Sequence, residues 1–333
     1  MTTVAIIGAG AIARDHVAAY RRIPGVRIAY VADLELSRAV DLAALAGGAT
    51  PTTAVGAIFA APEVEAVDIC TASGSHAALT IAAARAGKQI HLEKPAALSL
   101  DDFAQMEAAV AAAGVSLMVG QTARFQPVNR EIAARIVEGT IGAPRYLHVL
   151  WYTGHVWPEG WRSWQLDPAR SGGHPVHNGV HALDLAVWLL GSDPTRVFAR
   201  GFRSFAPTMG TPDSFHMTVR FASGALALLE IAYSLRARGD SLRRILAVGE
   251  AGSLHHTTEG DPNLFSDSLR PPPQATEDAL YYQLTHWLAT LAGKETPIVT
   301  LPQVRATLAA ALAAQESLTS GLAVTPERMV ADA

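Results

Sequence analysis

Residues 4–13 read VAIIGAGAIA and carry the pattern G-x-G-x-x-A at Gly8, Gly10 and Ala13. The short apolar run before Gly8 is typical of a buried parallel strand, and a helix is expected directly after it, over residues 12–22. Gly8 would permit a tight turn, Gly10 would let the main chain approach a pyrophosphate, and Ala13 is small enough for helix and strand to pack. This stretch therefore predicts a strand–turn–helix unit that binds a dinucleotide.

The residues around this turn also indicate which dinucleotide is bound. A helix N-terminus offers free N–H groups to phosphate, so the main chain at Ala11 and Ile12 is a candidate phosphate site. Asp33 ends the second expected strand, where its carboxylate can accept from the adenosine 2′-hydroxyl and would repel a 2′-phosphate. Arg38 lies about one helical turn further on and could reach a 2′-phosphate, or it is a surface charge. The sequence favours NAD, with NADP as the open alternative.

Up to residue 120, short apolar runs alternate with Ala-rich segments of helical length. Alternation of this kind favours an α/β fold with a doubly wound parallel sheet of the Rossmann type. Strands are expected at 4–8, 27–33, 66–71, 89–93 and 116–120, and helices at 12–22, 36–46, 76–86 and 100–113, with an N-cap at Ser99 and C-caps at Gly47, Gly87 and Gly114.

The pattern changes after residue 120, which predicts a second domain. Tight connections between strand-like runs suit antiparallel hairpins, so we expect an α+β domain with a mostly antiparallel open sheet. The expected boundaries are 1–120 for the dinucleotide-binding domain and 121–333 for a domain that binds substrate and forms oligomers. C-terminal helices could pack back on the first domain. Strands are expected at 145–152, 196–205, 214–221, 225–234 and 243–249, and helices at 127–138, 177–190, 278–292 and 302–321.

Composition excludes several classes of protein. Of the 333 residues, 50% are hydrophobic and only 17% are charged, which a disordered chain does not show. The net charge is −4 and no Lys/Arg cluster occurs, so neither nucleic acid nor an anionic membrane is an expected partner. No apolar stretch is long enough for a membrane helix, no basic residue precedes the apolar N-terminal run, and Cys70 is the single cysteine. A cytoplasmic protein is expected.

Residues 67–95 read VDICTASGSHAALTIAAARAGKQIHLEKP, with Glu93-Lys94-Pro95 directly after an expected strand. This stretch resembles the Gfo/Idh/MocA family of NAD(P)-dependent oxidoreductases. Residues 120–127 (GQTARFQP) resemble that family's crossover between domains, and residues 171–190 resemble its active-site helix. The resemblance implies a sugar, sugar derivative or cyclitol as substrate and a homodimer or homotetramer formed through the open sheet. It also implies that the cofactor is bound near Thr71, His76, Glu93, Lys94 and Gln121.

The sequence departs from the family pattern at two places. The family often has Thr-Pro-Asn where this chain has Thr71-Ala72-Ser73. Its active-site pattern is often G-G-G-x-x-x-D-x-G-x-H, whereas residues 171–181 here read SGGHPVHNGVH. The terminal histidine is kept as His181, and His177 stands where the family usually has an aspartate.

Lys94 closes a buried apolar strand, where an ammonium group is costly unless it meets a polar cavity. At the C-terminal end of a doubly wound sheet, that cavity is where ligands bind. We therefore predict that Lys94 bonds the substrate oxygen and stabilises the developing alkoxide. The alternative is a surface lysine paired with Glu93.

His177 and His181 lie four residues apart, so on a helix they share one face. Asp184 continues this polar stripe on an otherwise apolar helix, which predicts that the stripe lines a cavity. An imidazole can take a proton near neutral pH, so His181 is the predicted general base. His177 would orient the substrate or tune His181, and Asp184 would orient an imidazole or contact the substrate.

Two alternatives remain for these histidines. Together with His174, and completed by Asp184 or His155, they have a spacing that can bind zinc. They can equally be packing residues of a buried helix. The sequence favours a site without metal, since paired histidines on a dry helix are commoner than an isolated zinc site.

The segment from residue 151 to 164 is unusually aromatic. Indole and phenol faces stack on the apolar faces of sugar or cyclitol rings, although a packing cluster or an oligomer contact gives the same composition. The candidate substrate contacts there are His155, Trp161 and Arg162, beside Trp151, Tyr152, Trp157 and Trp164. Arg124 is expected to reach the cleft between the domains, where it binds a substrate oxygen or the nicotinamide amide, or serves as an ion-pair partner.

These residues predict reversible hydride transfer between a secondary alcohol carbon and a nicotinamide cofactor. Two other functions remain open on the same fold. One is a redox-assisted glycosidase or lyase that regenerates NAD in place. The other is a cofactor-binding regulator without turnover, for which the exchange of Asp for His177 is the argument.

Overall fold

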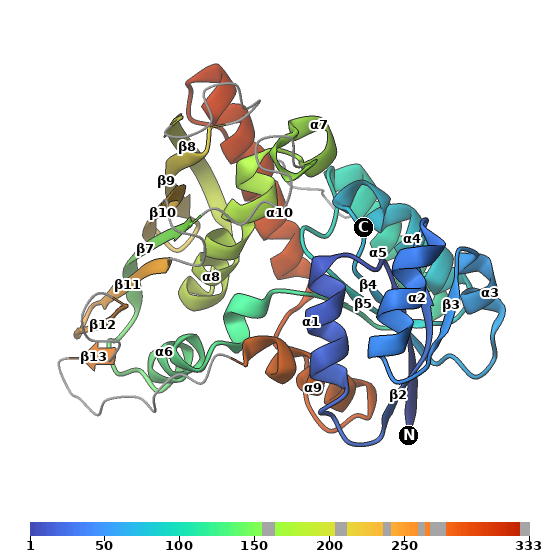
Figure 1. The fold of residues 1–333 in the computed structure, drawn as a ribbon. Helices are drawn as coiled ribbons and strands as arrows, with labels where there is room; N and C mark the ends of the chain where they lie inside the picture. Colours follow the sequence, from blue (N-terminus) through green and yellow to red (C-terminus); the bar gives the residue numbers. More distant parts are fainter. Residues whose placement is uncertain (155–163, 204–211, 236–240, 259–263, 267–277, 327–333) are drawn as a thin grey trace. The chain divides into compact units, whose positions relative to one another are not determined.

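The computed structural model describes residues 1–154, 164–203, 212–235, 241–258, 264–266 and 278–326 (Figure 1). The chain divides into two compact units. The first comprises Met1–Phe125 and Asp278–Leu301, and the second comprises Gln126–Glu277 and Pro302–Ala333. The first unit thus extends beyond residue 120 and includes a late segment of the chain.

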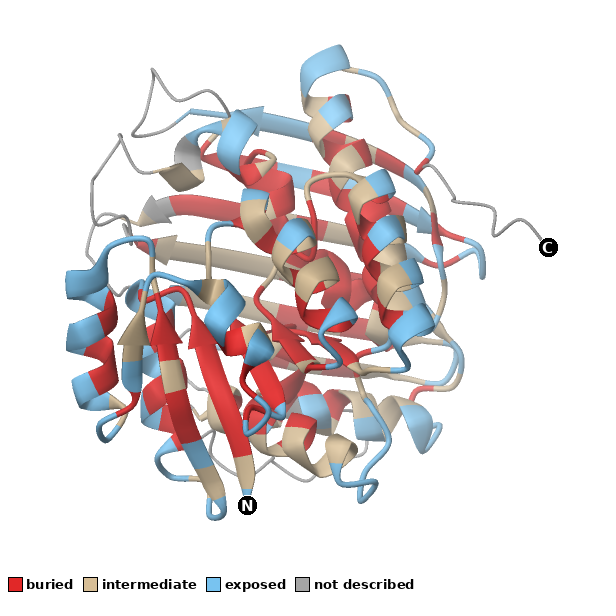
Figure 2. Ribbon diagram, turned by 90° about the vertical axis from the view of Figure 1, so that its right-hand side faces the viewer, coloured by how far each residue is buried: buried red, intermediate tan, exposed pale blue. Residues whose placement is uncertain are grey.

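The first unit contains a six-stranded sheet in the order β3-β2-β1-β4-β5-β6, in which all pairings are parallel. This is the strand order of a Rossmann fold, and it confirms the predicted class. The strands are β1 (Thr2–Ile7), β2 (Val26–Ala32), β3 (Thr50–Thr52), β4 (Ala66–Ile69), β5 (Gln89–Leu92) and β6 (Leu117–Val119). Their central members are buried on both faces, as Figure 2 shows by colour.

Helices connect successive strands of this sheet, and strand order reverses direction at β1. Because such crossovers are right-handed, α1 and α2 lie on one face and α4 and α5 on the other. The helices are α1 (Ala11–Tyr20), α2 (Leu36–Leu45), α3 (Val55–Ala60), α4 (His76–Arg85), α5 (Leu100–Ala113) and α9 (Ala279–Leu291), with short 3-10 turns η1 (Ser73–Ser75) and η2 (Thr122–Phe125). The carboxyl ends of β1 and β4 meet at the reversal, which is where ligands bind in such sheets.

Both ends of α5 carry the capping residues that the sequence predicts. Ser99 is its N-cap and accepts a hydrogen bond from the Asp102 N–H at 3.1 Å, and Gly114 ends the helix in the left-handed conformation. The sequence did not predict β3 and α3. β3 is only three residues long, contains Pro51 and lies at the sheet edge, where proline is tolerated.

The segment 278–301 belongs to the first unit because α9 packs against α1. Arg22, just after α1, forms an ion pair with Asp278. Its guanidinium carbon lies 4.5 Å from the centroid of the Tyr281 ring. Trp287 is fully buried in this layer.

The second unit contains a seven-stranded sheet in the order β13-β12-β11-β7-β10-β9-β8. β7 and β10 are parallel and every other pairing is antiparallel, as predicted for this domain. The strands are β7 (Pro144–Gly154), β8 (Pro194–Phe202), β9 (Ser214–Phe221), β10 (Leu226–Leu235), β11 (Ser241–Gly249), β12 (Ser253–Thr257) and β13 (Leu264–Ser266). β12 and β13 were not predicted, and β13 lies in the segment after residue 258, which reads as a loop.

Alternation along β9 distinguishes the two faces of this sheet. Phe215, Met217 and Val219 are buried, while His216 and Thr218 between them are exposed. The buried side chains face a helical layer that contains α8. The remaining helices of the unit are α6 (Pro127–Val137), η4 (Trp164–Leu166), α7 (Pro168–Ser171), η5 (Pro175–Gly179), α8 (Val180–Leu190) and α10 (Leu301–Ser320).

The helix predicted over 177–190 needs a correction. Residues Pro175–Gly179 form a π-helical turn, and the α-helix proper starts at Val180. A π-turn contains more residues per turn, so the spacing of four between His177 and His181 does not place them on one α-helical stripe.

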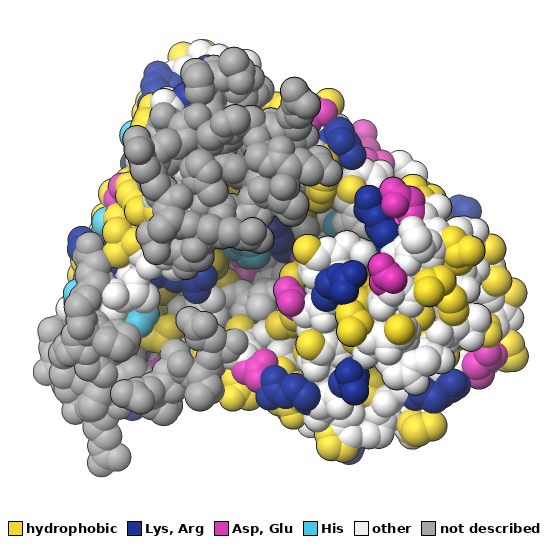
Figure 3. Space-filling view, in the orientation of Figure 1, with side chains coloured by type: hydrophobic (Ala, Val, Ile, Leu, Met, Phe, Trp, Pro, Cys, Tyr) yellow, Lys and Arg dark blue, Asp and Glu magenta, His cyan; other side chains and the backbone are white. Residues whose placement is uncertain are grey.

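Charges on the described surface are mixed in sign. On the face of the molecule that Figure 3 shows, Lys and Arg side chains lie among Asp and Glu side chains over the first unit. No helix among the described residues is long and apolar enough to cross a membrane.

Candidate active site

The turn after β1 has the geometry that a dinucleotide requires. Gly8 has φ +100°, and a Cβ there would lie 2.7 Å from the carbonyl oxygen of Cys70. Only glycine fits this position without strain. Gly10 is the N-cap of α1, with no side-chain cap, and a Cβ on it would meet no atom within 4 Å. The exposed main chain at Ala11 and Ile12 therefore opens onto space, which fits a bound pyrophosphate.

Asp33 is oriented toward this turn. One carboxylate oxygen accepts from the Ala9 N–H at 2.8 Å and the other from the Glu35 N–H at 2.9 Å. Arg38 pairs with Glu35, with 3.0 Å between Nε and Oε2. The residues after β2 thus present the Asp33 carboxylate, and the Arg38 guanidinium already has a carboxylate partner in Glu35. This arrangement fits an unphosphorylated ribose, as in NAD.

Glu93 and Lys94 follow β5 directly. Glu93 is buried and Lys94 is half-buried. The Lys94 N–H donates to Glu93 Oε2 at 3.1 Å. Burial lowers the pKa of Lys94, and the Glu93 carboxylate opposes this shift. An ammonium group held at the carboxyl end of the sheet can bond an oxygen of a bound ligand.

His76 connects the ends of two strands. Its Nδ1 lies 2.8 Å from the Pro95 carbonyl oxygen and its Nε2 lies 3.0 Å from that of Thr71. Burial lowers the pKa of His76, so the neutral ring donates to one of these carbonyls at a time. The side chain of Thr71 accepts from Ser75 at 2.7 Å. His76 thus holds main chain on either side of the predicted cofactor crevice.

Gln121 and Arg124 follow β6, and both are buried. The Oε1 atom of Gln121 has no hydrogen-bond partner among the described residues. Such an unsatisfied amide oxygen fits a site where a carboxamide group is bound. Arg124 donates from Nη1 to the carbonyl oxygen of Ile298 at 2.8 Å, within the first unit. Its predicted contact with substrate stays a prediction.

A buried polar network behind Lys94 was not predicted. His16 Nδ1 lies 2.7 Å from Asp68 Oδ2, and His16 Nε2 lies 3.2 Å from Glu93 Oε1. His91 Nδ1 lies 2.8 Å from Asp68 Oδ1, and Gln283 bonds the other nitrogen of His91 at 2.9 Å. The sequence did contain a signal, because Asp68 stands inside an apolar strand and a buried carboxylate needs partners.

The ionisation of this network follows from burial and charge. Burial is the largest single influence on the pKa of His16 and lowers it, but the charge and hydrogen bond of Asp68, together with Cys70, hold that pKa well above its ordinary value. Burial would raise the pKa of Asp68, yet His16 and His91 hold it well below its usual range. Burial likewise opposes ionisation of Glu93, but the hydrogen bond from His16 keeps its pKa lowered. Asp68 and Glu93 are therefore carboxylates and His16 is an imidazolium.

The histidines before and within α8 lie against aromatic rings of the second unit. His181 stacks on Trp151 of β7, with ring centroids 5.4 Å apart and 25° between the planes. His177 meets Trp164 edge-on at 5.5 Å. Asp184, one turn after His181, is fully buried. His181 and Asp184 thus lie on the layer that packs against the sheet.

Arg243 was not among the predicted site residues. It lies on β11 opposite Trp151, and its guanidinium carbon is 4.2 Å from the Trp151 ring centroid. This contact forms because two strands about 90 residues apart in the chain pair with each other, so the local sequence does not predict it. Three predicted substrate contacts, His155, Trp161 and Arg162, lie outside the described residues.

His174 has a packing role in the structure. Its ring stacks on Tyr233 with a centroid separation of 4.4 Å, and its Nδ1 lies 3.0 Å from the Pro212 carbonyl oxygen. Among the described residues, the one group of side chains with ligand atoms close enough for a metal ion is His16, Asp68 and Cys70. The three histidines of the predicted zinc alternative do not form such a group.

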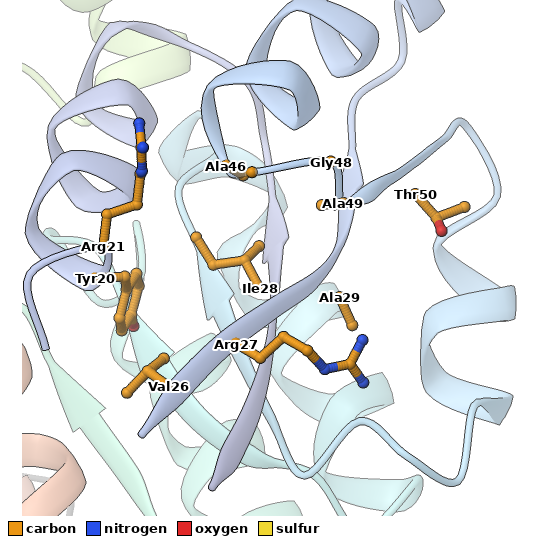
Figure 4. Close-up of a pocket in the computed structure, with 11 residues that line it drawn as sticks. Tyr20, Arg21, Val26, Arg27, Ile28, Ala29, Ala46, Gly48, Ala49 and Thr50 are labelled. Atoms are coloured by element: carbon orange, nitrogen blue, oxygen red, sulfur yellow. The ribbon is translucent and has the colours of Figure 1, made fainter. Parts of the chain in front are cut away.

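A surface pocket of about 370 Å³ lies elsewhere on the first unit (Figure 4). It is formed by the end of α1, the first half of β2 and the loop after α2. This is the amino-terminal edge of the sheet, opposite the phosphate-binding turn. Arg21 and Arg27 extend from it in different directions (Figure 4).

The fold, the phosphate-binding turn and the acidic residue after β2 define an NAD-binding oxidoreductase. Comparison with known families confirms this class. Residues 2–121 match the model of the oxidoreductase family with an NAD-binding Rossmann fold, and residues 129–255 match the GFO/IDH/MocA C-terminal domain. The chain belongs to the GFO/IDH/MocA family, and the resemblance noted from residues 67–95 is confirmed.

Several relatives are named as inositol dehydrogenases. The chain is 34% identical to the uncharacterized oxidoreductase YrbE of Bacillus subtilis, over 68% of this chain and 65% of that protein. It is 27% identical to the scyllo-inositol 2-dehydrogenase (NAD(+)) of the same organism, over 96% of this chain and 95% of that protein. Levoglucosan dehydrogenase in complex with NADH has the same fold, with a TM-score of 0.88 over 98% of this chain and all of that one, at 21% identity.

Proposed function

We propose that the protein transfers a hydride reversibly between NAD and a secondary alcohol carbon of a sugar, sugar derivative or cyclitol. The observation that carries the proposal is Lys94, a half-buried ammonium at the carboxyl end of the sheet whose turn fits a dinucleotide. The relatives named as inositol and levoglucosan dehydrogenases support the substrate class.

In this proposal each unit contributes one part of the chemistry. Gly8, Gly10 and the start of α1 bind the pyrophosphate, Asp33 binds the adenosine ribose, and Gln121 accepts a hydrogen bond from the carboxamide. Lys94 bonds the substrate oxygen and stabilises negative charge as it develops there. His181 removes the hydroxyl proton, with Trp151 orienting its ring. When bound, NAD supplies the hydride acceptor. The first unit is the cofactor domain and the second is the substrate domain.

The test is a screen of polyols, sugars and cyclitols for NADH formation by the purified protein. We expect steady NADH formation with at least one compound and none with Lys94→Met. Cleavage of a glycoside without net formation of NADH would contradict the proposal.

Cofactor preference gives a second, independent test. Because the Asp33 carboxylate is held in place and would repel a 2′-phosphate, NADH should bind at least several-fold more tightly than NADPH. Asp33→Ala should narrow this difference. Titration of protein fluorescence with each cofactor measures it, and Glu63→Ala, at an acidic residue remote from the turn, is the control. Tighter binding of NADPH by the unmodified protein would contradict the role of Asp33.

We also propose a homo-oligomer that forms in the cytoplasm through the outer face of the second sheet. This face carries exposed apolar side chains, among them Phe202 and Leu226. Exposed apolar area on one face of a sheet supports a protein contact there. Sedimentation of the purified protein should show a dimer or tetramer, and Leu226→Glu should reduce the assembly.

A further inference from the structure

His16 lies on the buried face of α1, the helix that starts at the phosphate-binding turn. Its two ring nitrogens face carboxylates from two strands, Asp68 in β4 at 2.7 Å and Glu93 after β5 at 3.2 Å. A carboxylate oxygen can only accept a hydrogen bond, so both nitrogens must carry hydrogen for both contacts to be favourable. Because the pKa of Glu93 is lowered and the side chain is a carboxylate, this geometry makes His16 an imidazolium.

The other groups around His16 are accounted for. On β5, His91 Nδ1 lies 2.8 Å from Asp68 Oδ1, and its Nε2 lies 2.9 Å from the amide nitrogen of Gln283 on α9. Burial raises the pKa of the Cys70 thiol to about 12, and burial together with Asp68 raises that of Tyr20, so both stay protonated. Among Asp68, Glu93, His16 and Lys94, two negative and two positive charges then balance.

Glu93 connects His16 to Lys94. One of its oxygens faces His16, and the other accepts from the main-chain N–H of Lys94. The same carboxylate opposes the effect of burial on Lys94. Without His16, Glu93 would lose a donor and a neighbouring positive charge, and a buried carboxylate in that position takes up a proton. Lys94 would then lose its negative neighbour.

We propose that His16 is a positioning residue for Lys94. The hydrogen bond to Asp68 holds the His16 ring in place, and the charged ring keeps Glu93 ionised beside Lys94. The Glu93 carboxylate in turn keeps the Lys94 ammonium protonated at neutral pH. A single side chain thereby joins the helix that binds phosphate to the strand end that carries the reactive lysine. The inference rests on the proposed function only where it assigns Lys94 to the substrate oxygen.

The ionisation of Lys94 can be followed in the full-length protein without any turnover. Trace labelling with acetic anhydride at a series of pH values, read by mass spectrometry, gives the midpoint at which Lys94 becomes reactive. His16→Leu should lower this midpoint by about one pH unit or more. On a confirmed substrate, the alkaline limb of kcat/KM should move in the same direction. Because labelling needs no activity, it decides the inference even if no polyol is oxidised.

A matched control separates this effect from loss of packing. His286 is another buried histidine of the first unit. It bonds Glu295 and the Ile298 N–H, and none of its hydrogen bonds within the described part of the chain involves Glu93. His286→Leu should lower stability and leave the Lys94 midpoint unchanged. Adding His16→Leu to Glu93→Gln should give no shift beyond that of Glu93→Gln alone. An unchanged midpoint in a folded His16→Leu protein that still binds NADH would overturn the inference.

The unmodified protein provides a test that does not depend on a variant folding. In ¹⁵N-histidine NMR spectra, both ring nitrogens of His16 should stay protonated at neutral pH and above. A neutral His16 ring at neutral pH would overturn the inference.

Gly120→Ala is a milder perturbation, because its Cβ would lie 3.1 Å from Glu93 Oε1. It should lower the Lys94 midpoint by less than His16→Leu does.

Discussion

Histidines occupy two contrasting settings in this chain. In the first unit, His16 and His91 are bonded to buried carboxylates, and the two carboxylates that face His16 favour a positive charge on its ring. In the second unit, His177 and His181 lie against the rings of Trp164 and Trp151. The first setting therefore suits a fixed charge on His16. The second contains His181, which we propose gains and loses a proton during turnover.

Removing His181 should have the largest effect on catalysis. If it is the general base, His181→Ala should lower kcat by about 10²-fold or more, because the substrate hydroxyl loses its proton acceptor. NADH binding, measured by fluorescence, should be retained. His148→Gln serves as a control, since His148 pairs with Glu230 on the outer face of the sheet. Near-full turnover by His181→Ala would remove the distinction between the two settings.

The fixed charge on His16 should appear in the stability of the protein. Because the pKa of His16 is higher in the folded than in the unfolded protein, protonation of His16 adds to the free energy of unfolding. This contribution is complete below about pH 6.5 and is lost as pH rises through the pKa of the folded state. The lowered pKa of Asp68 acts in the opposite direction, and its contribution is lost as pH falls below about 4. Stability should therefore decline above about pH 6.5, by at most about 1.4 kcal/mol per pH unit. Urea unfolding at a series of pH values measures this slope.

The slope should be smaller in His16→Leu, which has no proton to lose. His255→Leu provides a comparison, because His255 lies in the second unit, on β12. If His16→Leu kept the slope of the unmodified protein, some other group would cause it and the charge on His16 would not be fixed by its carboxylates.

His177→Asp tests the comparison by placing a carboxylate among the aromatic rings of the second unit. If residues 177 and 181 are coupled, the negative charge in His177→Asp should favour the His181 imidazolium, and the acidic limb of the kcat profile should move upward by about one pH unit. Activity should be retained. A pH profile that stays in place would mean that residues 177 and 181 are not coupled and that His177 is a packing residue.

Metal removal should have no effect. His16 Nδ1 and Asp68 Oδ2 are only 2.7 Å apart, a hydrogen-bond distance, and Cys70 is a protonated thiol, whereas zinc binds thiolate. EDTA should leave turnover unchanged, and elemental analysis should find no stoichiometric zinc. One tightly held zinc per chain would mean that one of the two groups of histidines binds a metal ion.

The sequence predicted the features that depend on local pattern. The G-x-G-x-x-A turn, Asp33 and the strand that precedes Glu93 and Lys94 each follow from periodicity and turn chemistry within a few residues. The π-turn at Pro175–Gly179 was not predicted, because the residue pattern of this segment also fits an α-helix and only the backbone structure distinguishes the two. The contacts of His16 with Asp68 and of Arg243 with Trp151 were missed for another reason. They join residues far apart in the chain, and only the strand order brings them together.

The first unit is built from two stretches of chain, with residues 126–277 between them. During synthesis, the ribosome releases α9 long after the strands of the first sheet. At a rate of about 5–20 residues per second, the delay is roughly 8–30 s. In that interval His91 lacks the Gln283 amide, and the surface that packs against Trp287 is uncovered. A nascent chain stopped before residue 278 should therefore be a substrate for chaperones, and release of α9 should end that state.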